Sequence, residues 1–118
     1  MKVHYTWKMF DNDVGKLASK VKASRMKIQN IYGIPRGGLI IAVKLSHLLD
    51  KPLLTNKTHI SKDTLIVDEI SDSGDTLLRF KHHNIVTIHY VNSSKIKPRY
   101  FERFKKEDDW VVYPWEIE

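Results

Sequence analysis

The sequence contains no cysteine, which excludes disulfide bonds and thiolate metal sites. No apolar run approaches the length of a membrane-spanning helix, and the first residues lack the apolar core of a signal peptide. There is no Gly-Lys-Ser/Thr phosphate loop, no Gly-x-Gly-x-x-Gly dinucleotide fingerprint and no Gly-x-Ser-x-Gly hydrolase motif. These absences predict a cytoplasmic protein without membrane association.

The 118 residues, 42% hydrophobic and 29% charged, predict one globular domain over residues 1–118. A formal net charge of +6 favours anionic partners such as phosphorylated metabolites, nucleic acid or membrane surfaces. The histidines do not predict a metal site, because His82 and His83 are adjacent and point to different faces of a helix. One basic stretch is predicted to be mainly a solvated face, with nucleic-acid contact as the alternative: Lys95, Lys97, Arg99, Arg103, Lys105 and Lys106.

Residues 64–77 carry the most informative pattern. Residues 64–67 are a short apolar run typical of a buried parallel strand, and Asp68 and Glu69 follow directly. Small polar residues around Gly74 then lead into a predicted helix over residues 77–83. A turn of this kind offers backbone N–H groups and hydroxyls to an anion, while the two acids suit a hard cation or sugar hydroxyls.

A second strand–loop–helix unit precedes this one. A strand is predicted over residues 28–34 and a helix over residues 39–49, with Pro35, Arg36, Gly37 and Gly38 between them. Glycine lets a backbone approach a ligand closely, and the guanidinium fork matches phosphate oxygens. The glycine pair alone is weak evidence, because close packing of a helix on a strand also needs glycine.

The remaining elements complete an α/β pattern. The capping residues Asp11-Asn12-Asp13 predict the start of a first helix, whose apolar stripe includes Val14, Leu17 and Val21. Short strands are predicted at residues 53–54 and 58–60, and a longer one at residues 85–91. The predicted fold is a mostly parallel sheet flanked by helices, with the ligand across the carboxyl ends of the strands.

The two units together resemble the type I phosphoribosyltransferases, and most of all the xanthine-guanine and archaeal purine enzymes. The resemblance rests on the apolar run, acid pair and Asp-Ser-Gly-x-Thr loop, the Arg-Gly-Gly corner, and the Lys-Pro and Trp-x-x-x-Pro-Trp-Glu patterns near the end. It implies a small C-terminal hood at about residues 92–118. It also implies a cis peptide in the pyrophosphate loop, near Pro35 and Arg36.

The resemblance implies a role for each matching residue. Asp68 and Glu69 would contact the ribose of phosphoribosyl pyrophosphate (PRPP), directly or through Mg²⁺. Asp72 would lie near N7 of a purine, with a helix N-cap as its alternative role. Three sets complete the implied site: Asp72, Ser73, Gly74, Asp75 and Thr76 for the 5′-phosphate; Pro35, Arg36, Gly37 and Gly38 for pyrophosphate; and Trp110, Val111 and Lys95 for the base.

Two departures from the family qualify this reading. Val91 or Asn92 stands where the subfamily has its base-contacting lysine, and Lys95 is the nearest substitute. The connection at residues 61–63 leaves no room for the long mobile loop that covers PRPP in catalytic members.

The predicted function is a Mg²⁺-dependent purine phosphoribosyltransferase of purine salvage, acting on PRPP and a purine base as a homo-oligomer, most simply a dimer. The alternative is a PRPP- or nucleotide-binding protein or regulator, RNA-binding among the possibilities, that keeps the cradle without turnover.

Overall fold

The computed structural model describes residues 1–117 and confirms the α/β class. Four parallel strands form the main sheet in the order β2 (Asn30–Gly33), β3 (Thr64–Ser71), β4 (Ile85–Tyr90) and β5 (Arg103–Phe104). Leu53 adds an isolated parallel bridge to Ile31 beyond β2. Because all strands run the same way, their carboxyl ends meet at one edge of the sheet.

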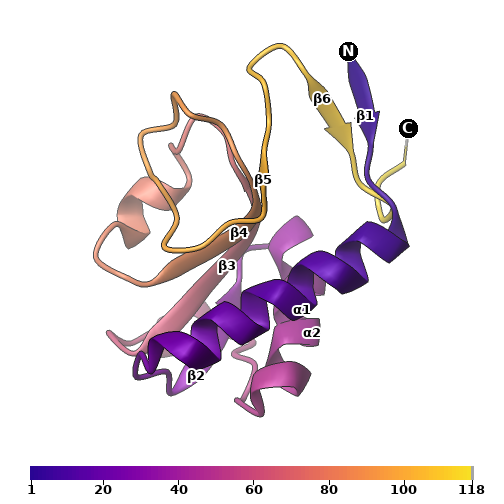
Figure 1. Cartoon of the computed structure of the whole chain (residues 1–118). Coiled ribbons are helices and arrows are strands. Elements are labelled where there is room, and N and C mark those ends of the chain that lie inside the picture. Colours follow the sequence, from indigo (N-terminus) through magenta and orange to yellow (C-terminus); the bar gives the residue numbers. More distant parts are fainter. Residues whose placement is uncertain (118) are drawn as a thin grey trace.

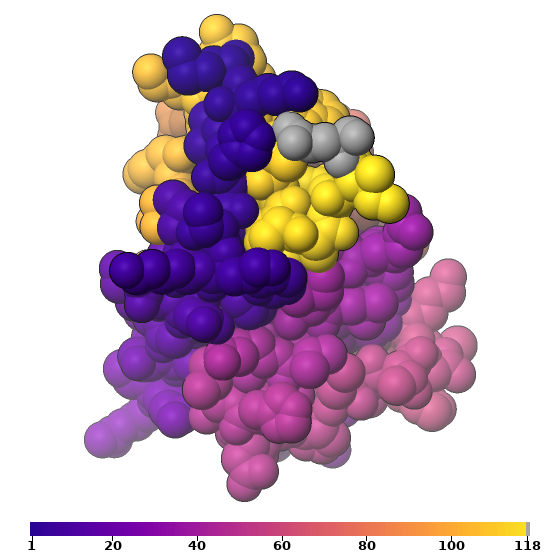
Figure 2. All heavy atoms as spheres, turned by 90° about the vertical axis from the view of Figure 1, so that its right-hand side faces the viewer, coloured from indigo at the N-terminus to yellow at the C-terminus, as the bar shows by residue number. Residues whose placement is uncertain are grey.

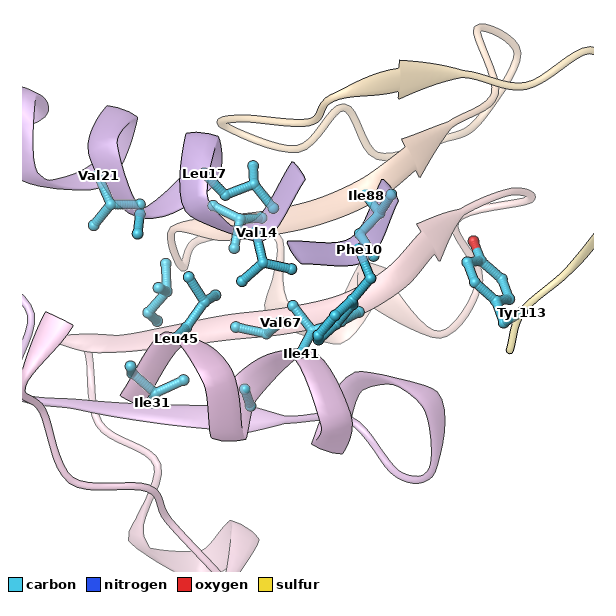
Figure 3. Close-up of a cluster of buried hydrophobic side chains, with 14 of the residues drawn as sticks. Phe10, Val14, Leu17, Val21, Ile31, Ile41, Leu45, Val67, Ile88 and Tyr113 are labelled. Carbon is cyan, nitrogen blue, oxygen red and sulfur yellow. The ribbon is translucent and has the colours of Figure 1, made fainter. Parts of the chain in front are cut away.

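Two helices, α1 (Trp7–Ser24) and α2 (Gly37–Leu49), cover one face of this sheet (Figure 1). Val14 and Leu17 of α1 and Leu45 of α2 point into one apolar core with Val67 and Ile88 of the sheet (Figure 3). Alternate strand residues face the other side, where Tyr32, Ile66 and Phe80 belong to a second, smaller cluster. The period of two in β2, β3 and β4 therefore divides the sheet between two cores.

The first helix begins earlier than predicted. Thr6 is its N-cap, and the Thr6 hydroxyl accepts a hydrogen bond from Met9 N at 3.1 Å. Asp13, predicted to lie at the helix start, is instead buried at 2% exposure in the second turn. It accepts hydrogen bonds from Tyr5 Oη at 2.5 Å and Arg103 Nε at 2.6 Å. Its carboxylate therefore anchors β5 to the helix.

The chain termini form a separate parallel ribbon of β1 (Lys2–His4) and β6 (Trp110–Val112), which stands above the main sheet in Figure 1. Figure 2 shows the C-terminal segment, in yellow, beside the indigo N-terminal segment and above the purple start of α2. The predicted hood is thus divided, because β5 extends the main sheet and only β6 joins the ribbon. The other strand of this ribbon is β1, from the N-terminal end of the sequence, which was not predicted as part of the hood.

Two smaller elements also differ from the sequence expectations. Residues Lys57–His59 form a short 3-10 helix, η1, where a strand was predicted. The helix after the acidic loop is a four-residue 3-10 helix, η2 (Leu77–Phe80), shorter than predicted. Ile60 packs against the second core, so the connection from α2 to β3 is held against the body of the protein at this residue. Within the described chain, no helix has both the length and the apolar character needed to span a bilayer.

Candidate active site

Three cavities meet at the carboxyl edge of the main sheet, and Glu69 lines all of them. The first, of about 520 Å³, lies between Arg36 and Trp115 and is called the arginine cavity below. The second, of about 170 Å³, is enclosed by residues 68–77 and is called the loop cavity. The third, of about 190 Å³, lies beside Trp110 and is called the tryptophan cavity. One carboxylate thus stands at the junction of three concave surfaces.

The acid pair lies at the end of β3, where the sheet opens toward these cavities. Asp68 is 7% exposed, and its Oδ1 accepts a hydrogen bond from Glu69 N at 2.9 Å. Burial, with the neighbouring Glu69 carboxyl adding to it, raises the pKa of Asp68. A buried carboxylate beside a second one is unfavourable unless a proton or a cation is shared between them. The pair therefore has the chemistry of a cation site.

No group of three or more histidine, cysteine, aspartate or glutamate side chains in residues 1–117 is placed to enclose a metal ion. Mg²⁺ does not require such a cage, since it commonly takes one or two carboxylates and completes its shell with water and substrate phosphate oxygens. Asp68 and Glu69 fit that partial set.

The Arg-Gly-Gly corner lies directly against Glu69 and, with it, lines the arginine cavity. The peptide bond between Pro35 and Arg36 is cis, as the resemblance implied. Gly37 is the first residue of α2, and a Cβ atom built on it would overlap the Glu69 carboxylate. The glycine therefore makes room for the Glu69 side chain, a close approach that no other residue allows.

The loop after β3 forms the wall of the loop cavity. Gly74 has φ +87°, a left-handed conformation, and a Cβ there would meet Ser94 Oγ at 2.7 Å. Lys95 N donates to Ser73 O at 3.0 Å, which ties this loop to the segment after β4. Within residues 1–117, no hydrogen bond uses the backbone N–H of Ser73, Gly74 or Thr76. These donors suit an anion, although η2 is too short to add a helix dipole.

Trp110 and Val111 line the tryptophan cavity together with Asp72. Trp110 is 67% exposed, which leaves its ring accessible for stacking. Trp110 N and Val112 O form the hydrogen bonds to the N-terminal segment. Because hydrogen-bonding groups alternate along a strand, the N–H and C=O of Val111 point to the other edge of the ribbon.

The structure does not bring Lys95 to this cavity. Its ammonium pairs with Asp75 at 2.5 Å, and this pairing lowers the pKa of Asp75. Lys105, just after β5, lines the tryptophan cavity instead, with a side chain only 6% exposed. Its Nζ lies 3.8 Å from Asp72 Oδ2. In the sequence, no feature distinguishes Lys105 from the other basic residues near it.

Two buried residues, His89 and Tyr113, form a hydrogen-bonded pair that contacts the backbone of Glu69. Tyr113 Oη lies 2.8 Å from His89 Nδ1 and donates to the Glu69 carbonyl at 3.3 Å. Burial raises the pKa of Tyr113, so its hydroxyl stays protonated as a donor. Only the Nδ1–H tautomer of His89 lets both contacts be hydrogen bonds, because the single hydroxyl proton goes to Glu69. This pair was not apparent from the sequence, since its residues are far apart along the chain.

Four of the six residues of the basic stretch are exposed, and several of the six have partners on the protein. Arg103 pairs with Asp13, Lys95 with Asp75, and Arg99 donates to Asn84 Oδ1 at 3.3 Å. Lys105 Nζ donates to two backbone carbonyls. The stretch is therefore mainly a solvated face, as predicted, and only Arg103 and Lys105 are half-buried against the protein.

Comparison with solved structures places this architecture among purine enzymes. Purine phosphoribosyltransferase from Pyrococcus horikoshii is 32% identical, with a TM-score of 0.84, over 99% of this chain and 95% of that one. The Helicobacter pylori xanthine-guanine-hypoxanthine phosphoribosyltransferase is 26% identical, with a TM-score of 0.81, over 99% and 93%. A Neisseria gonorrhoeae protein crystallised with ppGpp shares the fold at 19% identity and a TM-score of 0.77, over 99% and 90%. No family model and no curated protein matches the sequence.

The fold is that of a type I phosphoribosyltransferase. At 32% identity over nearly the whole of both chains, the protein belongs to the purine phosphoribosyltransferase family.

Proposed function

We propose that this protein transfers the 5-phosphoribosyl group of PRPP to a purine base. The observation that carries the proposal is the position of Glu69, which borders three cavities of different chemistry. One has an arginine and a glycine corner, one has unpaired backbone N–H groups, and one has an exposed tryptophan. Pyrophosphate, ribose 5-phosphate and a flat base have the corresponding chemistry.

In this proposal the bond between C1′ and a pyrophosphate oxygen breaks, and the electron pair leaves with pyrophosphate. Arg36 and the corner around it stabilise the charge that develops there. The new bond joins C1′ to a ring nitrogen of the base, whose proton passes to Asp72 or to water. Positioning of the two reactants in adjoining cavities supplies the rest of the catalysis.

Asp68 and Glu69 would hold Mg²⁺ together with substrate oxygens. The bound ion would offset the charge of the pyrophosphate group. Burial and the neighbouring Glu69 carboxyl raise the pKa of Asp68, so a cation bound there would stabilise its ionised form.

The test is product formation. Purified protein is incubated with PRPP, Mg²⁺ and, in turn, guanine, hypoxanthine, xanthine and adenine, and nucleoside monophosphate and pyrophosphate are quantified. The proposal expects both products in equal amounts with at least one base, and loss of both when EDTA replaces Mg²⁺. Absence of product with all four bases would reject it.

A second candidate, a PRPP- or nucleotide-binding protein without turnover, is favoured by the connection between α2 and β3. Leu53 bridges to Ile31 and Ile60 packs into the second core, so this segment is held on the protein. A site without a closing loop admits water to the reacting centre. Calorimetric binding of PRPP without any product would select this candidate.

A further inference from the structure

The segment after β4, residues 94–96, packs directly behind the loop that encloses the loop cavity. Ser71, at the end of β3 and 0% exposed, has its hydroxyl oxygen 2.7 Å from that of Ser94. On the loop itself, a Cβ atom on Gly74 would meet the backbone nitrogen of Lys95 at 2.9 Å. The loop and this segment are therefore in direct contact, without space for another side chain between them.

Lys95 contacts the loop on either side of Gly74. Its backbone N donates to Ser73 O at 3.0 Å, and its ammonium pairs with Asp75 Oδ1 at 2.5 Å. The side chains of this ion pair are 59% and 65% exposed, and exposed pairs contribute little to stability. The pair therefore matters more for the charge of the loop than for the stability of the fold.

Asp75 is an unfavourable residue in an anion site. It lines the loop cavity, together with the backbone N–H groups of Ser73, Gly74 and Thr76, which no hydrogen bond within residues 1–117 uses. The pairing with Lys95 lowers the pKa of Asp75, so its carboxylate is ionised. An ionised carboxylate repels a phosphate dianion bound at those N–H groups, and a cation beside the carboxylate cancels the repulsion. Lys95 supplies this cation.

We infer that Lys95 is a positioning residue for phosphate binding: its ammonium cancels the charge of Asp75 while its backbone N–H holds the loop. The ligand class is a phosphate monoester, of which the 5′-phosphate of PRPP is one. The inference deepens the proposed function and rests on it. It gives Lys95 a role different from the base contact that the resemblance implied, because the ammonium is directed to the loop cavity instead of the tryptophan cavity.

A charge series tests the inference. Asp75→Asn makes the pair positive, Lys95→Met makes it negative, and the double variant is neutral like wild type. Calorimetry measures the Kd of ribose 5-phosphate without Mg²⁺, with ribose as the control ligand that lacks the phosphate. Asp75→Asn should bind about threefold to tenfold more tightly than wild type, and Lys95→Met should bind more weakly by a similar factor. The double variant should return close to wild type, and all differences should shrink at high salt.

Lys97→Met is the matched control. It removes an exposed lysine from the same stretch of chain and changes the net charge of the protein by the same amount as Lys95→Met. It should leave the Kd of ribose 5-phosphate unchanged. Equal weakening in Lys97→Met and Lys95→Met would overturn the inference, because the effect would then come from overall charge. A thermal melt of each variant checks that it is folded.

Each alternative result has a defined meaning. If Asp75→Asn binds ribose 5-phosphate no more tightly than wild type, or the double variant binds as weakly as Lys95→Met, the pair acts only on loop structure and the inference is wrong. The proposed function would still stand if wild type binds PRPP with Mg²⁺. If wild type binds neither PRPP nor ribose 5-phosphate, both are wrong. Should Lys95→Met fail to fold, Asp75→Asn decides alone, since a purely structural pair predicts no gain in affinity there.

Discussion

Gly37→Ala should separate ligand binding from folding. A Cβ atom on residue 37 would overlap the Glu69 carboxylate, so the glutamate must rotate away from the junction of the three cavities. The backbone itself tolerates alanine, because Gly37 does not have positive φ and begins an α-helix, where alanine is favoured by up to about 1 kcal/mol. We therefore expect the thermal midpoint to stay the same or rise slightly.

The loss in binding follows from the contact that Glu69 would make. Removing one hydrogen bond to a charged group costs about 1.5–3 kcal/mol. The Kd of PRPP with Mg²⁺ should therefore rise about tenfold to a hundredfold. Calorimetry gives the Kd, and a thermal melt of the same sample shows that the fold is intact.

Gly15→Ala is the matched control. Gly15 lies inside α1, and a Cβ atom there would meet nothing within 4 Å. The same substitution should raise stability by about 1 kcal/mol through helix propensity and leave the Kd unchanged. If Gly37→Ala binds PRPP with wild-type affinity, the proposed role of Glu69 is refuted. Displacing the Glu69 side chain would then have had no effect on binding.

Two further predictions concern the buried polar groups. Burial lowers the pKa of His89 to about 4, below its unfolded value of about 6.5, so the unfolded chain takes up the proton first as pH falls. The free energy of unfolding should therefore lose about 3 kcal/mol between pH 6.5 and pH 4; His89→Gln should lack this part of the slope in urea titrations, and identical slopes would contradict the assignment. Both proteins retain Asp68, whose raised pKa acts in the opposite direction. Arg103→Met should lower the free energy of unfolding in urea by about 3 kcal/mol, because it leaves the Asp13 carboxylate buried without its cation. Lys44→Met, which removes one partner of the exposed Lys44–Asp11 pair, should cost less than about 1 kcal/mol, and equal losses would argue against the buried pair.

The elements that the sequence predicted well are those with strong local patterns. The apolar run before Asp68 became a buried parallel strand, and the glycine-rich corner after β2 became the turn into α2. Each of these depends on residues within a few positions of one another. Periodicity and turn chemistry act over that range, so a single sequence reveals them.

The errors concern residues whose partners are distant in sequence. Aspartate is a common helix-capping residue, but Asp13 lies in the second turn of α1. There it accepts a hydrogen bond from Arg103, 90 positions away in the sequence. Lys95 is near the expected base site in sequence, but it pairs with Asp75. The ribbon of β1 and β6 joins the two ends of the chain, and no local signal marks either strand as a partner of the other.

From the sequence alone one can identify the parallel α/β architecture, the acid pair and the Arg-Gly-Gly corner, because short-range patterns specify strands, turns and their ligand chemistry. Only the tertiary structure shows that Glu69 occupies the space left by Gly37 and that Tyr113 and His89 support it from the second layer. It also shows that Lys105, rather than Lys95, faces Asp72. The physical reason is the same in each case: these contacts join residues far apart in the sequence, and their positions are set by how the sheet, α2 and the loops pack and not by their neighbours in the chain.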